Sequence, residues 1–318
     1  MDELEEMLRL NALSEEIVKR YEAGERNLAS VDLRKIHIYY TCFMEVDFSG
    51  ASLQKSFFEN IYLVNTNFSC ANLERAGFSG YLISCDLSNT NLREVNFKGT
   101  NLTGVDLTGA DLTSANLSGA KLIGTNLRNA NLTGTKITES TIFCNTIMPD
   151  GRIENKSPKV IDAQELLKRY AKGERDFRNI FLDGVDLSGV NLQSINLCGA
   201  HLSHVNLQGA IFHGEDLSAH FIGCDMRDTQ LICTDVDYKG KAPSLICSDL
   251  RRAHLERFEW CGATFIGSNF QGAEGISDAS GEGFAFIHNT TWTGGTFVAG
   301  PTLGLHPFDF GDIDPSHF

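Results

Sequence analysis

The chain has 318 residues, of which 42% are hydrophobic and 21% charged, and its formal net charge at pH 7 is −14. No apolar run is long enough to span a membrane, the first residues are acidic where a signal peptide is basic, and no basic stripe is present, so we expect a cytoplasmic protein that binds neither membranes nor nucleic acids. The nine cysteines are odd in number and contain no CxxC pair, which argues against a disulfide framework and a zinc knuckle.

Residues 1–27 are predicted to form an N-terminal capping helix. Ile17 and Val18 belong to a helical pattern, and Gly24 stands where a helix would end in a left-handed residue. A repetitive sequence follows directly. We therefore expect the helix to close the open end of a repeat structure.

A five-residue repeat occupies residues 28–142. From Val105 the sequence reads VDLTG, ADLTS, ANLSG, AKLIG, TNLRN, ANLTG. A period of five matches neither a helix (3.6) nor a strand (2), so the pattern predicts a solenoid. The central apolar residue recurs from Leu28 to Phe78, one residue is then missing, and the register is predicted to resume at Leu82 and run through Ile137 to Ile142.

Residues 143–176 are predicted to form a linker and a second capping helix. The sequence MPDG at 148–151 is typical of a turn, and a polar segment follows it. The sequence RYAKGERDF at 169–177 then matches RYEAGERNL at 20–28. This shared entrance indicates an internal duplication.

A second run of repeats is predicted over residues 177–272, beginning at Phe177. Its register is expected to skip one residue between Ile222 and Met226. The run is interrupted at 237–243 and resumes at Leu245, with later central residues that include Trp260.

Residues 273–318 lose the five-residue rhythm and contain no lysine or arginine. Aromatic residues stand among glycines and threonines, a composition suited to a cap over the last coil; they are Phe284, Phe286, Trp292, Phe297, Phe308, Phe310 and Phe318. A dimer contact or a docking tail for a partner is the alternative.

These repeats resemble the pentapeptide-repeat family, whose consensus is A(D/N)LXX, and the RYxxGERxF entrance resembles members common in cyanobacteria. The resemblance implies four pentapeptides per coil, with the central Leu or Phe and the small residue two positions earlier pointing inward. The expected fold is thus an all-β solenoid made of two right-handed quadrilateral β-helices, each preceded by a short capping α-helix.

A core filled in this way leaves no cavity for a small molecule, so we expect no enzyme activity, no cofactor and no bound metal. The alternative is a metal site or an active site in the second run, where five candidate side chains crowd together: His201, His204, His213, His220 and Cys224. His204 and Cys224 are expected one coil apart on similar outward positions.

The negative charge raises another alternative, an acidic DNA mimic that binds a topoisomerase such as gyrase, as some relatives are thought to do. A mimic needs charge spread along the rod. In this chain much of the excess lies near the two ends, and the first run is close to neutral.

One wall of the first run is apolar when the repeats are folded into four faces. The candidate partner-binding residues on this wall are Met44, Tyr62, Val64, Tyr81, Ile83, Ile123 and Phe143. A contiguous apolar wall on a solenoid is typical of a contact surface. The linker, a terminal helix or the second run could instead cover it. A smaller stripe is predicted on the second run, formed by Phe181, His201 and Phe221. It would either contact the apolar wall of the first run or serve as an independent site.

We therefore expect a non-enzymatic protein–protein interaction scaffold with an unidentified protein partner, self-association being open. The resemblance to cyanobacterial regulators of cell differentiation favours a regulatory role. The sequence sets neither the arrangement of the two runs nor the oligomeric state.

Overall fold

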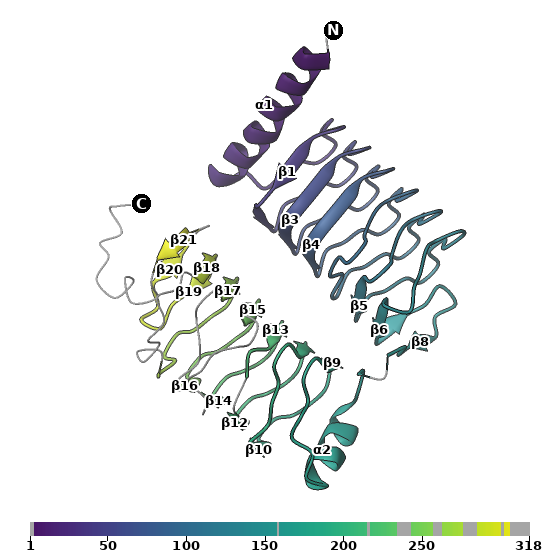
Figure 1. The fold of residues 1–318 in the computed structure, drawn as a ribbon. Helices are drawn as coiled ribbons and strands as arrows, with labels where there is room; N and C mark the ends of the chain where they lie inside the picture. Colours follow the sequence, from purple (N-terminus) through teal and green to yellow (C-terminus); the bar gives the residue numbers. More distant parts are fainter. Residues whose placement is uncertain are drawn as a thin grey trace. The chain divides into compact units, whose positions relative to one another are not determined.

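The computed structural model describes residues 3–157, 159–214, 217–233, 243–256, 263–275, 285–299 and 302–305. They form a β-solenoid of about 11 turns with two helices (Figure 1). The chain divides into two compact units, unit 1 (Met1–Ser157) and unit 2 (Pro158–Phe318). Among the described residues, no helix has the length and apolar character needed to cross a membrane.

Unit 1 begins with a helix and continues as coils joined by parallel pairing. Its elements are α1 (Glu3–Glu22), β1 (His37–Tyr39), β2 (Cys42–Met44), β3 (Phe57–Val64), β4 (Gly77–Ile83), β5 (Lys121–Ile123), β6 (Ile142–Cys144), β7 (Thr146–Ile147) and β8 (Ile153–Glu154). Strands β1, β2 and β4 all pair with β3 in parallel, and β5 pairs with β6 in parallel. β7 and β8 form a short antiparallel pair.

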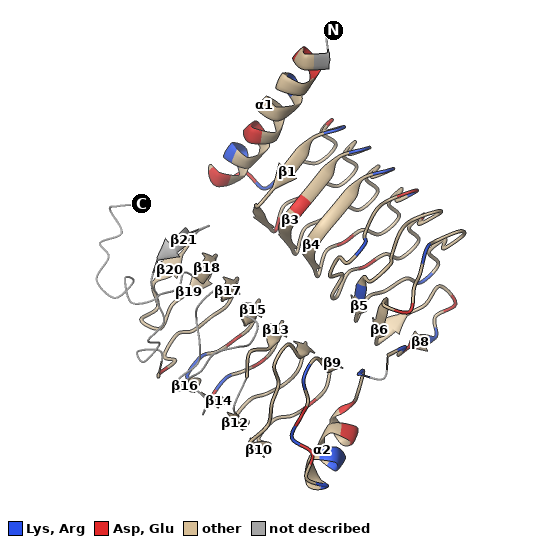
Figure 2. Ribbon diagram, viewed as in Figure 1, with Lys and Arg blue, Asp and Glu red and all other residues tan. Residues whose placement is uncertain are grey.

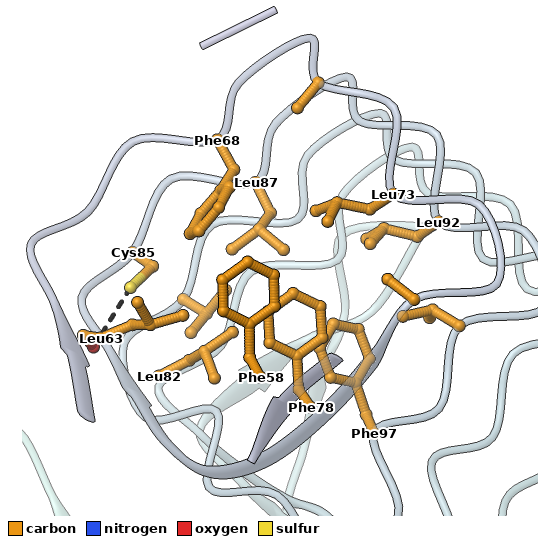
Figure 3. Close-up of a cluster of buried hydrophobic side chains, with 14 of the residues drawn as sticks. Phe58, Leu63, Phe68, Leu73, Phe78, Leu82, Cys85, Leu87, Leu92 and Phe97 are labelled. Carbon is orange, nitrogen blue, oxygen red and sulfur yellow. Dashed lines mark hydrogen bonds between the residues drawn. The ribbon is translucent and has the colours of Figure 1, made fainter. Parts of the chain in front are cut away.

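The central residues of the repeats fill the interior of unit 1. Phe58, Phe78 and Phe97 form one column, with ring centroids 4.9 and 5.2 Å apart (Figure 3). Phe58 and Phe97 are 0% exposed, and burying such a side chain stabilises the fold by about 1.5–3 kcal/mol. Tightly packed side chains thus fill the interior of the coils, as the repeat pattern predicts.

The Asp or Asn before each central residue has a local structural role. The carboxylate of Asp47 accepts a hydrogen bond from Ser49 N (2.9 Å), and the side-chain oxygen of Asn67 accepts one from Ser69 N (2.9 Å). Such a bond, two residues along the chain, fixes the turn at each corner. It explains why Asp and Asn recur at this position whether or not a charge is needed.

The missing residue after Phe78 is confirmed. Leu82 pairs with Leu63, and the pairing shifts by one where Ile61 lies opposite Gly80. A Cβ on Gly80 would lie 2.3 Å from the carbonyl oxygen of Ile61, and Gly80 has φ +112°. The shortened side therefore requires glycine.

The predicted end of the first run is wrong by one residue. Phe143, not Ile142, pairs with Leu122 and enters the core, and Ile137 is 39% exposed. An extra residue in the turn after Ile137 moves the register. Phe143 consequently points inward and is not part of an outer wall.

Unit 2 has a shorter helix and more regular strands. Its elements are α2 (Ala163–Ala171), β9 (Phe181–Asp183), β10 (Asn191–Gln193), β11 (His201–Ser203), β12 (Ile211–Gly214), β13 (His220–Ile222), β14 (Gln230–Cys233), β15 (Ser244–Ile246), β16 (His254–Glu256), β17 (Thr264–Ile266), β18 (Ala285–His288), β19 (Thr290–Thr291), β20 (Phe297–Val298) and β21 (Thr302–Leu305). One sheet has the order β10-β12-β14-β16 and another β9-β11-β13-β15-β17-β18-β21, in which only the β18–β21 pair is antiparallel. β19 and β20 form a separate antiparallel pair.

The skipped residue of the second run lies earlier than predicted. Phe221, not Ile222, pairs with Leu202 and joins the core, so the four-residue step falls between Leu217 and Phe221. Ile222 takes the following position, outside the core cluster. The predicted interruption at 237–243 falls, except for its last residue, outside the described residues, as does Trp260.

Part of the predicted aromatic cap can be placed. Trp292 is buried in the core cluster of unit 2, with its ring 5.2 Å from Phe270 and 6.2 Å from Phe265. Phe297 is 60% exposed. The other predicted cap residues, apart from Phe286 in β18, lie outside the described ranges; they are Phe284, Phe308, Phe310 and Phe318.

Candidate functional site

The predicted apolar wall consists of two columns of side chains on unit 1. Met44, Val64 and Ile83 follow one another in register across β2, β3 and β4, and Ile123 occupies the equivalent position in β5. In the neighbouring column, the rings of Tyr62 and Tyr81 stack with centroids 4.9 Å apart. The structure therefore brings Met44, Val64, Ile83 and the two tyrosines together, whereas Ile123 lies two coils beyond Ile83 and Phe143 is not part of the wall.

The aliphatic column is buried. Met44 is 8% exposed, Ile83 is 1% exposed, and Val64 and Ile123 are 0% exposed, yet none belongs to the core cluster of unit 1. Tyr62 and Tyr81 are half-buried, and burial raises the pKa of Tyr81 to about 12. A partner-binding role for this wall stays a prediction.

An aromatic cluster that the sequence analysis missed lies at the N-terminal end of unit 1. It consists of His37, Tyr39, Tyr40 and Phe57, of which Tyr39 is 60%, Tyr40 77% and Phe57 46% exposed. The His37 ring lies 5.6 Å from Tyr39 and 6.0 Å from Phe57, and the rings of Tyr39 and Tyr40 are 6.0 Å apart at 85°. Exposed aromatic groups of this density are typical of binding surfaces.

Regular pairing of β1 with β3 positions the aromatic cluster. His37 lies opposite Phe57, and Tyr39 lies opposite Glu59. A carboxylate oxygen of Glu59 is 3.2 Å from His37 Nε2. The signal in the sequence was the replacement of small and polar outward residues by aromatic ones in HIYY and FFE.

A groove of about 580 Å³ separates α1 from β1 beside the aromatic cluster. Glu15, Val18, Lys19 and Glu22 of α1 and His37 and Tyr39 of β1 are among the residues that line it. The helix is fixed above the first coil because Ile17 is buried and Ser14 Oγ accepts a hydrogen bond from His37 N (3.2 Å). The groove therefore lies between two elements that contact each other at the coil end.

The histidine-rich part of unit 2 does not have the predicted geometry. His204 is exposed and its Nδ1 lies 2.9 Å from an Asp183 carboxylate oxygen, whereas Cys224 is buried and its thiol donates to the Leu202 carbonyl. The expectation of similar outward positions for His204 and Cys224 is wrong, because the earlier register skip places Gly223 beside His204. Burial raises the pKa of the Cys224 thiol to about 12.

The aromatic stripe of unit 2 also differs by one member. Phe181, His201 and His220 stack, with centroids 5.0 and 4.4 Å apart, and His220 replaces the predicted Phe221. His220 Nδ1 lies 2.6 Å from Ser244 Oγ. Within the described ranges, no three His, Cys, Asp or Glu side chains are grouped so that they could hold a metal ion.

Acidic and basic residues are intermixed on unit 2 (Figure 2). Asp225 pairs with Arg227, and Asp249 with Arg251, at 2.6 Å in both cases. Hydrogen bonding to Arg178 lowers the pKa of Asp176 to about 2. These aspartates are neutralised locally and do not form a continuous line of negative charge.

A family model described as pentapeptide repeats matches residues 41–80, 81–119, 110–142, 182–218 and 244–274. A comparison with proteins of curated function finds no match.

Solved structures with similarity to the chain include two cyanobacterial proteins. HetL of Nostoc sp. strain PCC 7120, a pentapeptide repeat protein involved in heterocyst differentiation regulation, is 23% identical over 89% of this chain and 98% of its own, with a TM-score of 0.27. Rfr23 of Cyanothece 51142 is 27% identical over 39% of this chain and 94% of its own (TM-score 0.26). QnrB1, a plasmid-mediated fluoroquinolone resistance protein, is 18% identical over 68% of this chain and 93% of its own, with a TM-score of 0.20.

Proposed function

The chain belongs to the pentapeptide-repeat family, and from this premise we propose that it is a non-enzymatic scaffold that binds another protein. Family membership indicates the fold better than the function, so the proposal depends on the surface. The described core is filled with Leu and Phe side chains. A packed interior favours binding at the outer faces over catalysis in a cavity.

The aromatic cluster is the observation that carries the proposal. Tyr39, Tyr40 and Phe57 are large and exposed. Tyr39 and Phe57 belong to the paired strands β1 and β3, and Tyr40 N donates a hydrogen bond to Glu59 O (3.0 Å). Aromatic side chains on a rigid support dominate the binding energy of many protein interfaces. The apolar wall is proposed as a second contact surface, which its half-buried Tyr62 and Tyr81 would present, because the aliphatic residues Met44, Val64, Ile83 and Ile123 are at most 8% exposed.

We further propose that both units are right-handed quadrilateral β-helices with four five-residue sides per turn. Side-chain hydrogen bonds that climb one coil support this geometry. They join residues 20 apart, as from Asn67 to Asp47, or 19 apart across the shortened side, as from Asn91 to Asn72.

Affinity capture from host lysate tests the scaffold. The intact protein should retain a specific protein that Tyr39→Ser/Tyr40→Ser loses and that Ile153→Ser keeps. Ile153 is a matched control because it is 65% exposed on β8, away from the aromatic cluster in the sequence. Identical capture by all three proteins would overturn the aromatic cluster as the binding surface.

The DNA-mimic alternative is not favoured by the surface. Asp225, Asp228 and Asp249 each pair with an arginine, whereas a phosphate backbone presents uncompensated charge. A gyrase supercoiling assay tests the DNA-mimic alternative. Inhibition of supercoiling when the protein is equimolar with gyrase would support this alternative.

A further inference from the structure

We propose that the aromatic cluster and the groove beside it bind an arginine-containing basic segment of the partner protein. The inference rests on the proposed function and names the chemistry of the partner at that site.

The charges around the groove favour a basic occupant. Glu15 and Glu22 line the groove, and Glu59 lies at the edge of the aromatic cluster. Lys19 and His37 are the basic residues among the described groove-lining side chains. Lys19 Nζ lies 3.8 Å from a Glu15 carboxylate oxygen, and His37 Nε2 lies 3.2 Å from one of Glu59. The carboxylates thus outnumber the cations, and opposite charge on a partner would be attracted and oriented.

The tyrosines favour arginine over other cations. Tyr39 and Tyr40 are nearly perpendicular and highly exposed, so ring faces are accessible to a planar guanidinium. Arginine stacks on such faces while its N–H groups bind carboxylates. Glu59 lies opposite Tyr39 in the β1–β3 pair, and an arginine bound here would share the Glu59 carboxylate with His37, whose Nε2 is 3.2 Å from one of its oxygens.

The protein itself uses the same combination twice. The guanidinium carbon of Arg26 lies 4.0 Å from the Tyr21 ring centroid, and that of Arg175 lies 3.8 Å from the Tyr170 ring. Each arginine also donates a hydrogen bond to a backbone carbonyl of the adjoining helix end. Arginine on tyrosine is therefore a geometry that the first coil of each unit accommodates.

The shape of the groove fits an extended segment. One side is the helix α1 and the other is the strand β1, so a chain lying between them can reach Glu22 and Tyr39 together. Val18 is partly exposed and provides apolar surface along the groove. A segment that alternates arginine with an aliphatic residue meets both requirements.

Fluorescence anisotropy with the purified full chain tests the inference. The probe is a fluorescein-labelled peptide of alternating arginine and leucine, compared with the same peptide carrying lysine or glutamate in place of arginine. We expect the arginine peptide to bind most tightly, the glutamate peptide not to bind, and affinity to fall as salt rises.

Variants separate the two kinds of contact. Tyr39→Leu/Tyr40→Leu should weaken binding roughly tenfold because two cation–π contacts are lost, whereas Tyr39→Phe/Tyr40→Phe should restore most of it. Glu22→Gln/Glu59→Gln should reduce the salt dependence, and Ile153→Ser should behave like the parent protein. Equal affinity of the parent and the leucine variant, or equal binding of all three peptides, overturns the inference.

The outcome is distinguishable from failure of the scaffold proposal. If lysate capture depends on Tyr39 and Tyr40 but the arginine peptide does not bind, the scaffold stands and the basic partner is wrong. If the tyrosine variants change only the sedimentation coefficient of the protein alone, the occupant is a second copy of the chain, which also overturns the inference.

Discussion

The two units begin with the same motif but close their first coils with different elements. Tyr21 accepts a hydrogen bond from Met44 N (3.1 Å), and Tyr170 accepts one from Gln193 N (2.6 Å). In both motifs the arginine before the tyrosine pairs with a glutamate five residues later. The motif is therefore a device that ties a helix to the exposed edge of the first coil.

The difference lies in what covers the rest of that edge. In unit 1 the 20-residue helix α1 extends across the coil and supplies Ser14 to His37 N. In unit 2 the helix has nine residues, and an extended segment lies along β9, where Lys159 O accepts from Phe181 N (2.9 Å). Backbone groups at an open edge need partners, and a side chain or a strand can supply them. In unit 1, the helix and β1 border the groove beside the aromatic cluster.

The largest effect is expected where coil geometry leaves no room for a side chain. A Cβ would lie 2.3 Å from Ile61 O at Gly80 in unit 1 and 2.1 Å from Ile195 O at Gly214 in unit 2. Gly80→Ala should lower the free energy of unfolding by about 3 kcal/mol or more, and amide hydrogen exchange should speed up first in unit 1. Gly214→Ala should have the same effect, with the faster exchange first in unit 2. Gly99→Ala, at φ +71° in open space, should cost only about 1 kcal/mol. Equal losses for Gly80 and Gly99 would contradict the close approach.

A charge on the apolar wall should have the next largest effect. Ile83 is 1% exposed, so Ile83→Glu should destabilise by about 3 kcal/mol in thermal unfolding, because a buried carboxylate loses its hydration. Lys98→Glu, at an exposed position of a neighbouring coil, should change little. An unchanged melting temperature for Ile83→Glu would show that the wall is accessible, as a binding surface requires.

Removing the tyrosine hydroxyls compares the two caps directly. Tyr21 is 3% exposed, so Tyr21→Phe should cost about 1–2 kcal/mol in urea unfolding. The hydrogen bond of Tyr170 is exposed, and water can replace it, so Tyr170→Phe should cost less than about 1 kcal/mol. The reverse order would mean that the shorter helix depends more on its tyrosine.

Tyr21 also predicts that the stability of the fold falls at alkaline pH. Burial raises the pKa of Tyr21 to about 12, above its ordinary value near 10, so the folded state favours the neutral phenol. The contribution of Tyr21 to the stability of the folded state is complete below pH 10 and is lost as the pH rises toward 12. Tyr81 contributes in the same direction. Tyr21→Phe should therefore reduce, and not abolish, the alkaline loss of stability.

A small effect is also expected at Ser14, the side chain through which α1 contacts His37 N. Ser14→Ala should cost about 1 kcal/mol and speed amide exchange at His37. The amide of Phe181 in unit 2 serves as the internal reference, because its partner is backbone. Unchanged exchange at His37 would show that the helix does not protect this edge.

Several features could be predicted from residues alone. The five-residue period indicated a solenoid, the paired RYxxGER motifs indicated two capping helices, and the missing residue after Phe78 was located correctly. Each depends on a strong local signal, because a side of the coil has room for only certain side chains.

The failures share one cause. Phe143 and Phe221 were assigned to outward positions because Ile142 and Ile222, their neighbours, were equally apolar. Where two adjacent residues could both fill the core, pairing with Leu122 and Leu202 decided between them. The misplaced pair of His204 and Cys224 follows from the same one-residue slip, which exchanges inward and outward positions.

The sequence by itself determined the period, the filled core and the caps, because these depend on side-chain volume and on hydrogen bonds between near neighbours. Only the tertiary structure decided which outward residues are buried and which are exposed. It buries Val64 and Ile123 and exposes Tyr39 and Tyr40, although all four are apolar or aromatic and outward in the repeat. Burial depends on the packing around each side chain, which a five-residue pattern of residue types does not encode.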